Sequence, residues 1–269
     1  MSTLELENIK HPDNSGNNLT LAADGSINKI HVKSGDAGVV SASPQADDLV
    51  VEASTEVGIT LISPDDQSAR IRFTSPSTDA GDVGGATIFY RQNINKMVIG
   101  TEVAGGQLAL KSGYGAENLK IDGSGRVTTP NQPYFMVYRN AGNYNVGAGQ
   151  TVSIIYDTAR YNIGGHFNNS NYRFTAPIDG LYNFSASVNH YNLPAGTRLR
   201  IQLHLNGQLT LMGGYIRTYD TGDHNVVFNS SLKLSANDYV EMKRYSDGAS
   251  SAGTSSGQLW NWFSGYLIG

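Results

Sequence analysis

The chain has 269 residues, of which 39% are hydrophobic and 16% are charged, and this composition is typical of a folded rather than a disordered protein. Its net charge of -4 leaves no polybasic footprint, so we expect neither nucleic acid nor an anionic membrane as a direct partner. The absence of cysteine excludes a disulfide scaffold and thiolate metal sites, and no apolar stretch is long enough for a membrane-spanning helix.

The first half reads as a succession of short strands separated by turn residues, and the 31 glycines favour an all-β chain. A weak internal echo links 18–27 with 118–127, since both read as strand, tight turn, strand. The expected strands are 19–21, 49–52, 59–62, 69–73, 86–90, 97–101, 107–111 and 119–121.

The chain changes character near residue 130. Only four aromatic residues precede Pro133, whereas 21 follow it. Residues 128–133 contain two prolines, which hold the backbone extended and deny hydrogen-bond donors to a sheet. We therefore expect a β-rich region over 1–127, a linker over 128–133 and a second domain over 134–269.

The second half carries cleaner strand patterns. Apolar residues alternate with polar ones over 198–206, and Asn206 with Gly207 then predicts a tight hairpin turn. Further strands are expected at 135–138, 151–156, 209–212, 226–234, 239–243 and the end of the chain. Together they give about eight to ten strands, the number that a jelly roll needs.

Residues 172–188 organise this half. Apolar side chains occupy alternate positions on both sides of a turn at 177–180, where proline and glycine supply the required dihedral angles. Phe174 to Pro177, Asp179 to Tyr182 and Phe184 resemble the signature of the complement C1q globular head, and 263–268 resemble its closing strand. The resemblance covers roughly 133–269 and implies a jelly roll of the tumour-necrosis-factor superfamily.

The first half is similar in style to the shafts and attachment regions of bacteriophage tail fibres, in which three chains intertwine as β-structure. With so few aromatic residues, one copy would bury too little apolar surface to offset its chain entropy. The alternative is a monomeric β-sandwich or solenoid. The expected fold is thus an intertwined trimeric β-shaft followed by a C1q-like jelly roll.

Candidate chemistry is sparse. Residues 253–257 match the hydrolase nucleophile pattern, but they lie in a Ser/Gly-rich loop without the required strand and helix. The six histidines lack ligand spacing, so we expect no metal site and no cofactor. Calcium, which some C1q-type trimers hold at the apex, would need loop carboxylates such as Asp220, Asp223 and Asp247.

Aromatic residues near loops are the receptor-binding candidates, because tyrosine offers a rigid apolar face with a polar tip. With neighbouring polar residues, the set is Tyr191, Tyr215, Tyr219, Asp220, Asp223, His224, Tyr245 and Asp247. Other aromatics are expected in the core or a trimer interface: Phe174, Tyr182, Phe184, Trp260, Trp262, Phe263 and Tyr266. We expect Trp260, Trp262 and Tyr266 to share one face of a closing strand that is buried on both sides.

These resemblances imply a non-enzymatic, homotrimeric phage fibre. Its N-terminal region would bind other virion proteins, in the tail or capsid, and its C-terminal knob a host-surface glycan or protein. No secretory signal is evident, so assembly is expected in the host cytoplasm and residence on the virion. The alternatives are a capsid decoration or tail-collar protein, a receptor-degrading tailspike enzyme, and a bacterial C1q-like surface protein.

Overall fold

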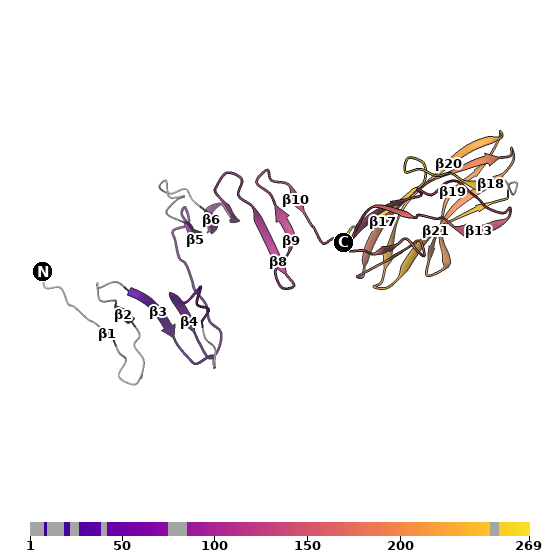
Figure 1. Cartoon of the computed structure of the whole chain (residues 1–269). Coiled ribbons are helices and arrows are strands. Elements are labelled where there is room, and N and C mark those ends of the chain that lie inside the picture. The colour runs from indigo at the N-terminus through magenta and orange to yellow at the C-terminus, as the bar shows by residue number, and fades with distance from the viewer. Residues whose placement is uncertain (1–7, 10–18, 22–26, 39–41, 75–84, 248–252) are drawn as a thin grey trace. The chain divides into compact units, whose positions relative to one another are not determined.

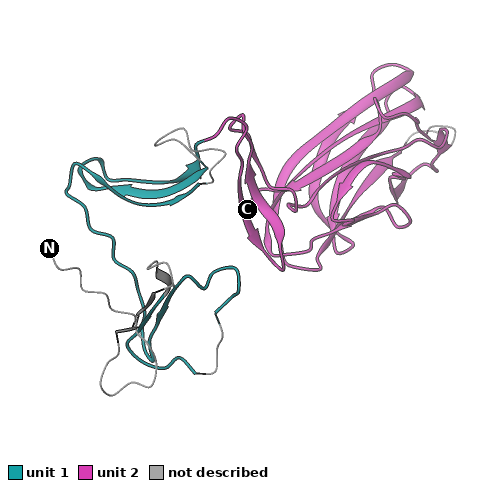
Figure 2. Cartoon of the chain, turned by 60° about the vertical axis from the view of Figure 1, so that its left-hand side comes forward, with its two compact units in different colours: residues 1–102 teal, residues 103–269 magenta. Residues whose placement is uncertain are grey.

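The computed structural model describes residues 8–9, 19–21, 27–38, 42–74, 85–247 and 253–269, and in these residues the protein is all-β (Figure 1). The chain divides into two compact units, residues 1–102 and 103–269 (Figure 2). None of the described residues belongs to a helix long and apolar enough to cross a membrane.

The N-terminal unit contains two small sheets. One joins β1 (Asn8–Ile9), β2 (Leu19–Leu21), β3 (Ile27–Lys33) and β4 (Leu49–Glu52), with β3 and β4 parallel. The other is an antiparallel meander of β5 (Ser68–Phe73), β6 (Ala86–Arg91) and β7 (Lys96–Thr101), with the short 3-10 turn η1 (Gln92–Ile94) before β7.

The prediction of a strand at 59–62 is wrong. This segment is irregular and has no pairing partner, and the side chains of Ile59 and Ile62 are exposed. Its short run of apolar residues satisfied the strand pattern, but a strand also needs a neighbour to satisfy its backbone groups. The other seven strands expected in the first half are present, with bounds that differ from the expected ones by at most three residues.

The second unit opens with a three-stranded sheet of β8 (Leu108–Ser112), β9 (Ala116–Ile121) and β10 (Val127–Thr128). Strands β9 and β10 pair around a turn in which Asp122 accepts hydrogen bonds from the amides of Ser124 (2.9 Å) and Arg126 (3.0 Å). This confirms the expected strand–turn–strand arrangement at 118–127, the second of the two similar segments. The corresponding turn of the first half lies outside the described residues.

Two antiparallel sheets then form a sandwich, which is the expected jelly roll. The first sheet contains β11 (Tyr134–Tyr138), β12 (Tyr144–Asn145), β14 (Thr158–Ile163), β17 (Gly180–Leu193), β20 (Gly222–Leu234), β22 (Gly253–Thr254) and β23 (Trp262–Leu267). The second contains β13 (Gln150–Ser153), β15 (Phe167–Asn168), β16 (Arg173–Thr175), β18 (Arg198–Leu205), β19 (Gln208–Arg217) and β21 (Tyr239–Ser246).

The chain crosses between the two sheets at the turn inside residues 172–188. Phe174 on β16 and Phe184 on β17 therefore face each other from opposite sheets, with ring centroids 5.8 Å apart. Phe263 of β23 completes the centre, 5.9 Å from Phe184 and 5.0 Å from Phe135. Phe174, Tyr182, Phe184 and Phe263 are buried, as expected of core residues.

The turn at Asn206 and Gly207 forms as expected, because both residues adopt positive φ (51° and 80°) between β18 and β19. On β18, Leu199, Ile201 and Leu203 are buried in the core. The intervening residues consequently face outward from the second sheet.

The closing strand differs from expectation. Strand β23 begins at Trp262, so Trp260 lies before it rather than on its face. Phe263 points into the core, whereas Tyr266 on the opposite face is 51% exposed and Trp262 is half-buried. Within a single chain, the strand is therefore covered on one side only.

Candidate functional site

Three of the receptor-binding candidates come together on the outer face of the second sheet. The register places Tyr245 of β21 directly opposite Arg200 of β18, and Arg200 directly opposite Tyr215 of β19. The guanidinium carbon of Arg200 lies 5.1 Å from the Tyr245 ring centroid and 5.4 Å from that of Tyr215. These contacts are cation–π interactions that order a charged group between two rings.

Asp247 extends this arrangement by one row. Its carboxylate accepts hydrogen bonds from the backbone amide and from Nε of Arg198, both at 2.6 Å. The backbone bond from Arg198, followed by the guanidinium, holds the pKa of Asp247 below its usual value, so the group is ionised at neutral pH. Arg217 stands opposite Arg198 in the register. We call Arg198, Arg200, Tyr215, Arg217, Tyr245 and Asp247 the arginine–tyrosine ladder.

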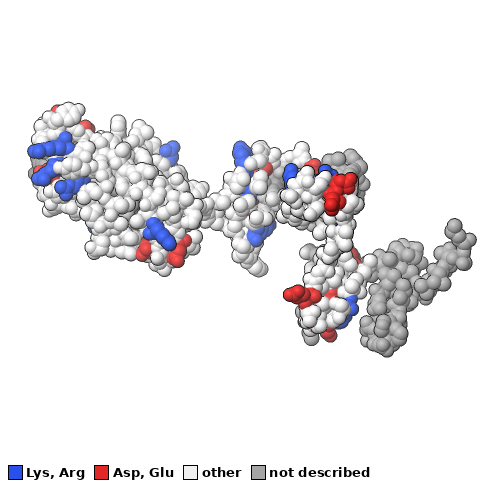
Figure 3. Space-filling view, turned by 180° about the vertical axis from the view of Figure 1, so that it is seen from behind, with Lys and Arg blue, Asp and Glu red and all other residues white. Residues whose placement is uncertain are grey.

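The ladder carries a positive charge in a protein that is acidic as a whole, because three arginines accompany one aspartate. Figure 3 shows Lys and Arg side chains gathered at one end of the larger unit. Exposed guanidinium groups and tyrosine rings suit contacts with sugars, carboxylates and phosphates. The ladder therefore has the chemistry to contact an acidic or hydroxyl-rich surface.

A second group of candidates gathers where β20 begins. Tyr219 is 88% exposed, and its ring meets His224 edge-on with centroids 6.3 Å apart. His224 Nε2 lies 3.3 Å from Asp220 Oδ1. Asp223 instead accepts a hydrogen bond from the Asn192 amide at 3.2 Å.

Tyr191 stands apart from both groups, because it is half-buried and its hydroxyl donates to Asn145 Oδ1. The receptor-binding candidates predicted from the sequence therefore form two separate groups, and Tyr191 belongs to neither.

The three aspartates considered for calcium each have a different partner: His224 for Asp220, Asn192 for Asp223 and Arg198 for Asp247. In the described parts of the chain, no three histidine or carboxylate side chains lie close enough to hold a metal ion.

The nucleophile pattern at 253–257 does not form an elbow. Its central Ser255 follows the two-residue strand β22, and a turn rather than a helix comes next. The Ser255 hydroxyl donates to Asn189 Oδ1 at 2.6 Å, so its partner is an amide and not a general base.

The family model described as the C1q domain matches residues 135–268, which span all the core strands from β11 to β23. Residues 135–268 are a C1q domain.

Solved structures similar to this chain include the globular domain of zebrafish complement 1qA, with 19% identity over 51% of this chain and 98% of that one and a TM-score of 0.38. The Eiger TNF of S. frugiperda has 11% identity over 51% and 94% of the two chains, with a TM-score of 0.39. Murine APRIL at pH 5.0 has 6% identity over 51% and 99%, with a TM-score of 0.40. Among curated proteins, none matches the chain.

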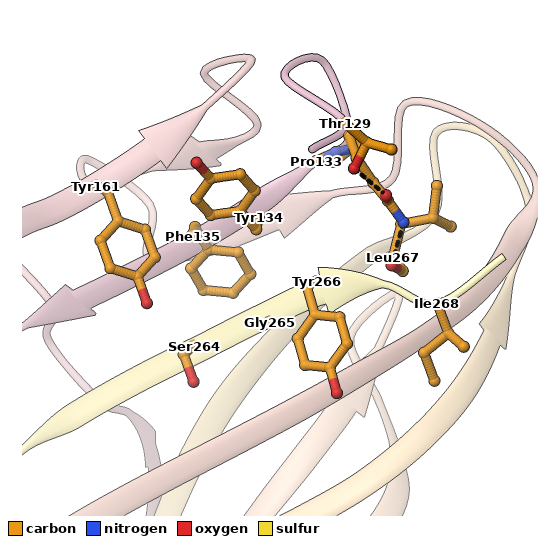
Figure 4. Close-up of a pocket in the computed structure, with 11 residues that line it drawn as sticks. Thr129, Pro133, Tyr134, Phe135, Tyr161, Ser264, Gly265, Tyr266, Leu267 and Ile268 are labelled. Carbon is orange, nitrogen blue, oxygen red and sulfur yellow. Dashed lines mark hydrogen bonds between the residues drawn. The ribbon is translucent and has the colours of Figure 1, made fainter. Parts of the chain in front are cut away.

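The C1q domain also carries an open apolar groove of about 620 Å³ on the outer face of its first sheet (Figure 4). Tyr134, Tyr161 and Tyr266 line it, and the rings of Tyr134 and Tyr161 meet edge-on with centroids 5.5 Å apart. Gln132 borders the groove and donates a hydrogen bond to the Leu267 carbonyl at 2.6 Å. The expected linker is thus attached to the closing strand of the C1q domain.

The arginines of the ladder were missed by sequence reasoning. Arg198 and Arg200 were visible as the polar partners of Leu199 and Ile201, which predicts that they face outward. Their tyrosine neighbours come from β19 and β21, and the cross-strand register that joins them cannot be read from a single strand's pattern.

Proposed function

We propose that the protein is a homotrimeric fibre of a bacteriophage virion. Its N-terminal unit attaches to the particle and forms a β-rich shaft, and its C1q domain contacts a receptor on the host surface. The chain is made and assembled in the host cytoplasm and resides on the virion.

The observation that carries this proposal is an uncovered apolar face in the N-terminal unit. Strands β5, β6 and β7 place Ile71, Ile88 and Ile99 directly opposite one another, and Tyr90 with Met97 in a parallel row. Ile71, Ile99 and Met97 are each about half exposed in the single chain. A sheet needs a hydrophobic face covered to be stable, so further copies of the chain supply the cover.

The C1q domain supports the same assembly. C1q domains are typically homotrimeric and are in general non-enzymatic binding modules. The groove beside Tyr134 and Tyr266 and the half-buried Trp262 give the first sheet an apolar outer face for neighbouring copies. Three copies then present three equivalent arginine–tyrosine ladders, and avidity compensates for weak binding at each one.

The proposal is tested with the intact particle and the purified chain. Light scattering is expected to give three times 28.9 kDa, and labelled antibodies are expected to decorate a tail fibre in electron micrographs. Labelling spread over the capsid would instead support a decoration protein. Release of reducing ends from host polysaccharide would support a tailspike enzyme.

A further inference from the structure

A polar layer closes one end of the hydrophobic core of the C1q domain. In the first sheet, Tyr144, Thr254, His190 and His224 stand directly opposite one another on β12, β22, β17 and β20. Arg244 reaches this row from β21 of the facing sheet, where its Nη1 donates to Thr254 Oγ1 at 2.9 Å. The layer lies near the C-terminal end of β17, where His190 is located. The other end of β17 lies beside the chain's C-terminus, because the Leu181 amide donates a hydrogen bond to the Gly269 carbonyl.

Arg244 and His190 are both fully buried and poorly satisfied. Nε and Nη2 of Arg244 have no hydrogen-bond partner, and neither does either ring nitrogen of His190. No carboxylate of the described chain forms an ion pair with Arg244. Burial lowers the pKa of Arg244 to about 10, so its guanidinium remains charged at neutral pH.

The carboxylates near the pair have other partners, because Asp220 lies against His224 and Asp157 against Arg139. Tyr144 and Tyr191 influence Arg244 electrostatically, and His224 stands directly opposite His190 in the register. The guanidinium carbon of Arg139 lies 4.4 Å from the Tyr144 ring centroid, and its ion pair with Asp157 at 3.5 Å adds no net charge to the layer. A buried cation without a counter-charge is strongly unfavourable, and buried donors without partners add to that cost.

We propose that Arg244 and His190 hold a small inorganic anion of the halide class between the two sheets. The anion accepts from Nε and Nη2 of Arg244 and from one ring nitrogen of His190, and it cancels the buried charge. Water would satisfy the donors but would leave the guanidinium without a counter-charge. A monoatomic ion is favoured because both side chains are inaccessible to solvent.

Thermal unfolding of the full-length protein in sodium chloride and in sodium gluconate of equal ionic strength tests this site, since gluconate is too large to enter. At about ten times its Kd, chloride is expected to raise the melting temperature by roughly 3–6 °C relative to gluconate. Arg244→Met is expected to abolish the difference, whereas the control Lys233→Met, at an exposed position of β20, is expected to retain it.

Anomalous X-ray diffraction from bromide-soaked crystals of the unmodified protein provides a second test. It does not require that a variant folds. An anomalous peak beside the Arg244 guanidinium is the expected result. Equal melting temperatures in the two salts together with no bromide peak would overturn the proposal and assign water to the layer. A chloride effect that persisted in Arg244→Met would also overturn it.

Discussion

Phe263 is the residue on which the centre of the C1q domain depends. It is fully buried, and its ring contacts those of Phe135 and Phe184 of the first sheet and that of Phe167 of the second. Phe263→Ala is expected to lower the free energy of unfolding by about 3–5 kcal/mol, because it leaves a cavity in a close-packed core. Chemical denaturation measures the change. The control Tyr219→Ala, at an exposed position, is expected to cost less than about 1 kcal/mol. The assignment fails if Phe263→Ala unfolds like the parent protein.

Arg200 is the central residue of the arginine–tyrosine ladder. Its guanidinium lies between two exposed or half-buried rings, so its replacement removes contact surface without opening the core. Arg200→Gln is expected to reduce binding of the purified protein to host cells roughly tenfold, as for an interfacial arginine hot spot. Lys233→Gln on β20, an exposed cation of the other sheet, is the matched control. Equal loss in both variants would indicate a general charge effect rather than a site.

At the residue scale, the sequence was informative wherever a side chain obeyed the strand period. Phe174, Tyr182, Phe184 and Phe263 could be assigned to the core for that reason. Arg244 could not, because a buried arginine contradicts the pattern that assigns polar residues to the surface. Its burial follows from alternation along β21, where Val240 and Met242 precede it on the inner face.

At the scale of elements, Glu52 at the end of β4 joins three segments. Its carboxylate accepts from the Ala37 amide at 2.9 Å and pairs with Lys33 at 3.0 Å and His31 at 2.9 Å. The Ala37 bond and the Lys33 contact lower the pKa of Glu52 to about 2. A lowered pKa means that this stabilisation is complete above the ordinary value near 4.5 and is lost as the pH falls through about 2.

We therefore expect the Ala37 amide signal in NMR spectra to keep its folded position down to about pH 3 and to change below it. Glu52→Gln is expected to remove this transition. Titration of Glu52 near pH 4.5 in the parent protein would show that the carboxylate does not hold β3, β4 and residues 34–38 together.

Element positions were largely predictable, and pairings were not. The period of two located β18 and β20, and turn chemistry located the hairpin at Asn206. The parallel pairing of β3 with β4 left no trace in either strand, because it depends on how the intervening residues return. The short strands β12, β15 and β22 were missed because two residues cannot display a period.

At the scale of the whole molecule, the linker expected at 128–133 falls inside the second compact unit, whose first residue is Val103. The entire hydrophobic core of the C1q domain lies after Pro133, so a fragment of residues 133–269 is expected to fold alone. Limited proteolysis followed by mass spectrometry is expected to leave a resistant fragment that begins near Pro133. A fragment that begins near Val103 would show that the sheet of β8, β9 and β10 is protected together with the domain; Asn131 of the linker donates a hydrogen bond to the Glu117 carbonyl of β9.

The proposed shaft differs from the C1q domain, because the proposal requires its sheets to be covered by other chains. Ile99 on β7 stands at one end of the row formed with Ile88 and Ile71, on the face that a trimer would bury. A charge there is unpaired once the face is covered, so Ile99→Asp is expected to open the N-terminal unit to proteases while the C1q domain melts unchanged. Gln92→Asp, in the exposed turn η1, introduces the same charge as a control and is expected to leave the digestion pattern intact. If both variants were digested like the parent protein, the apolar face of β5, β6 and β7 would not be shared between chains, and the intertwined shaft would be excluded.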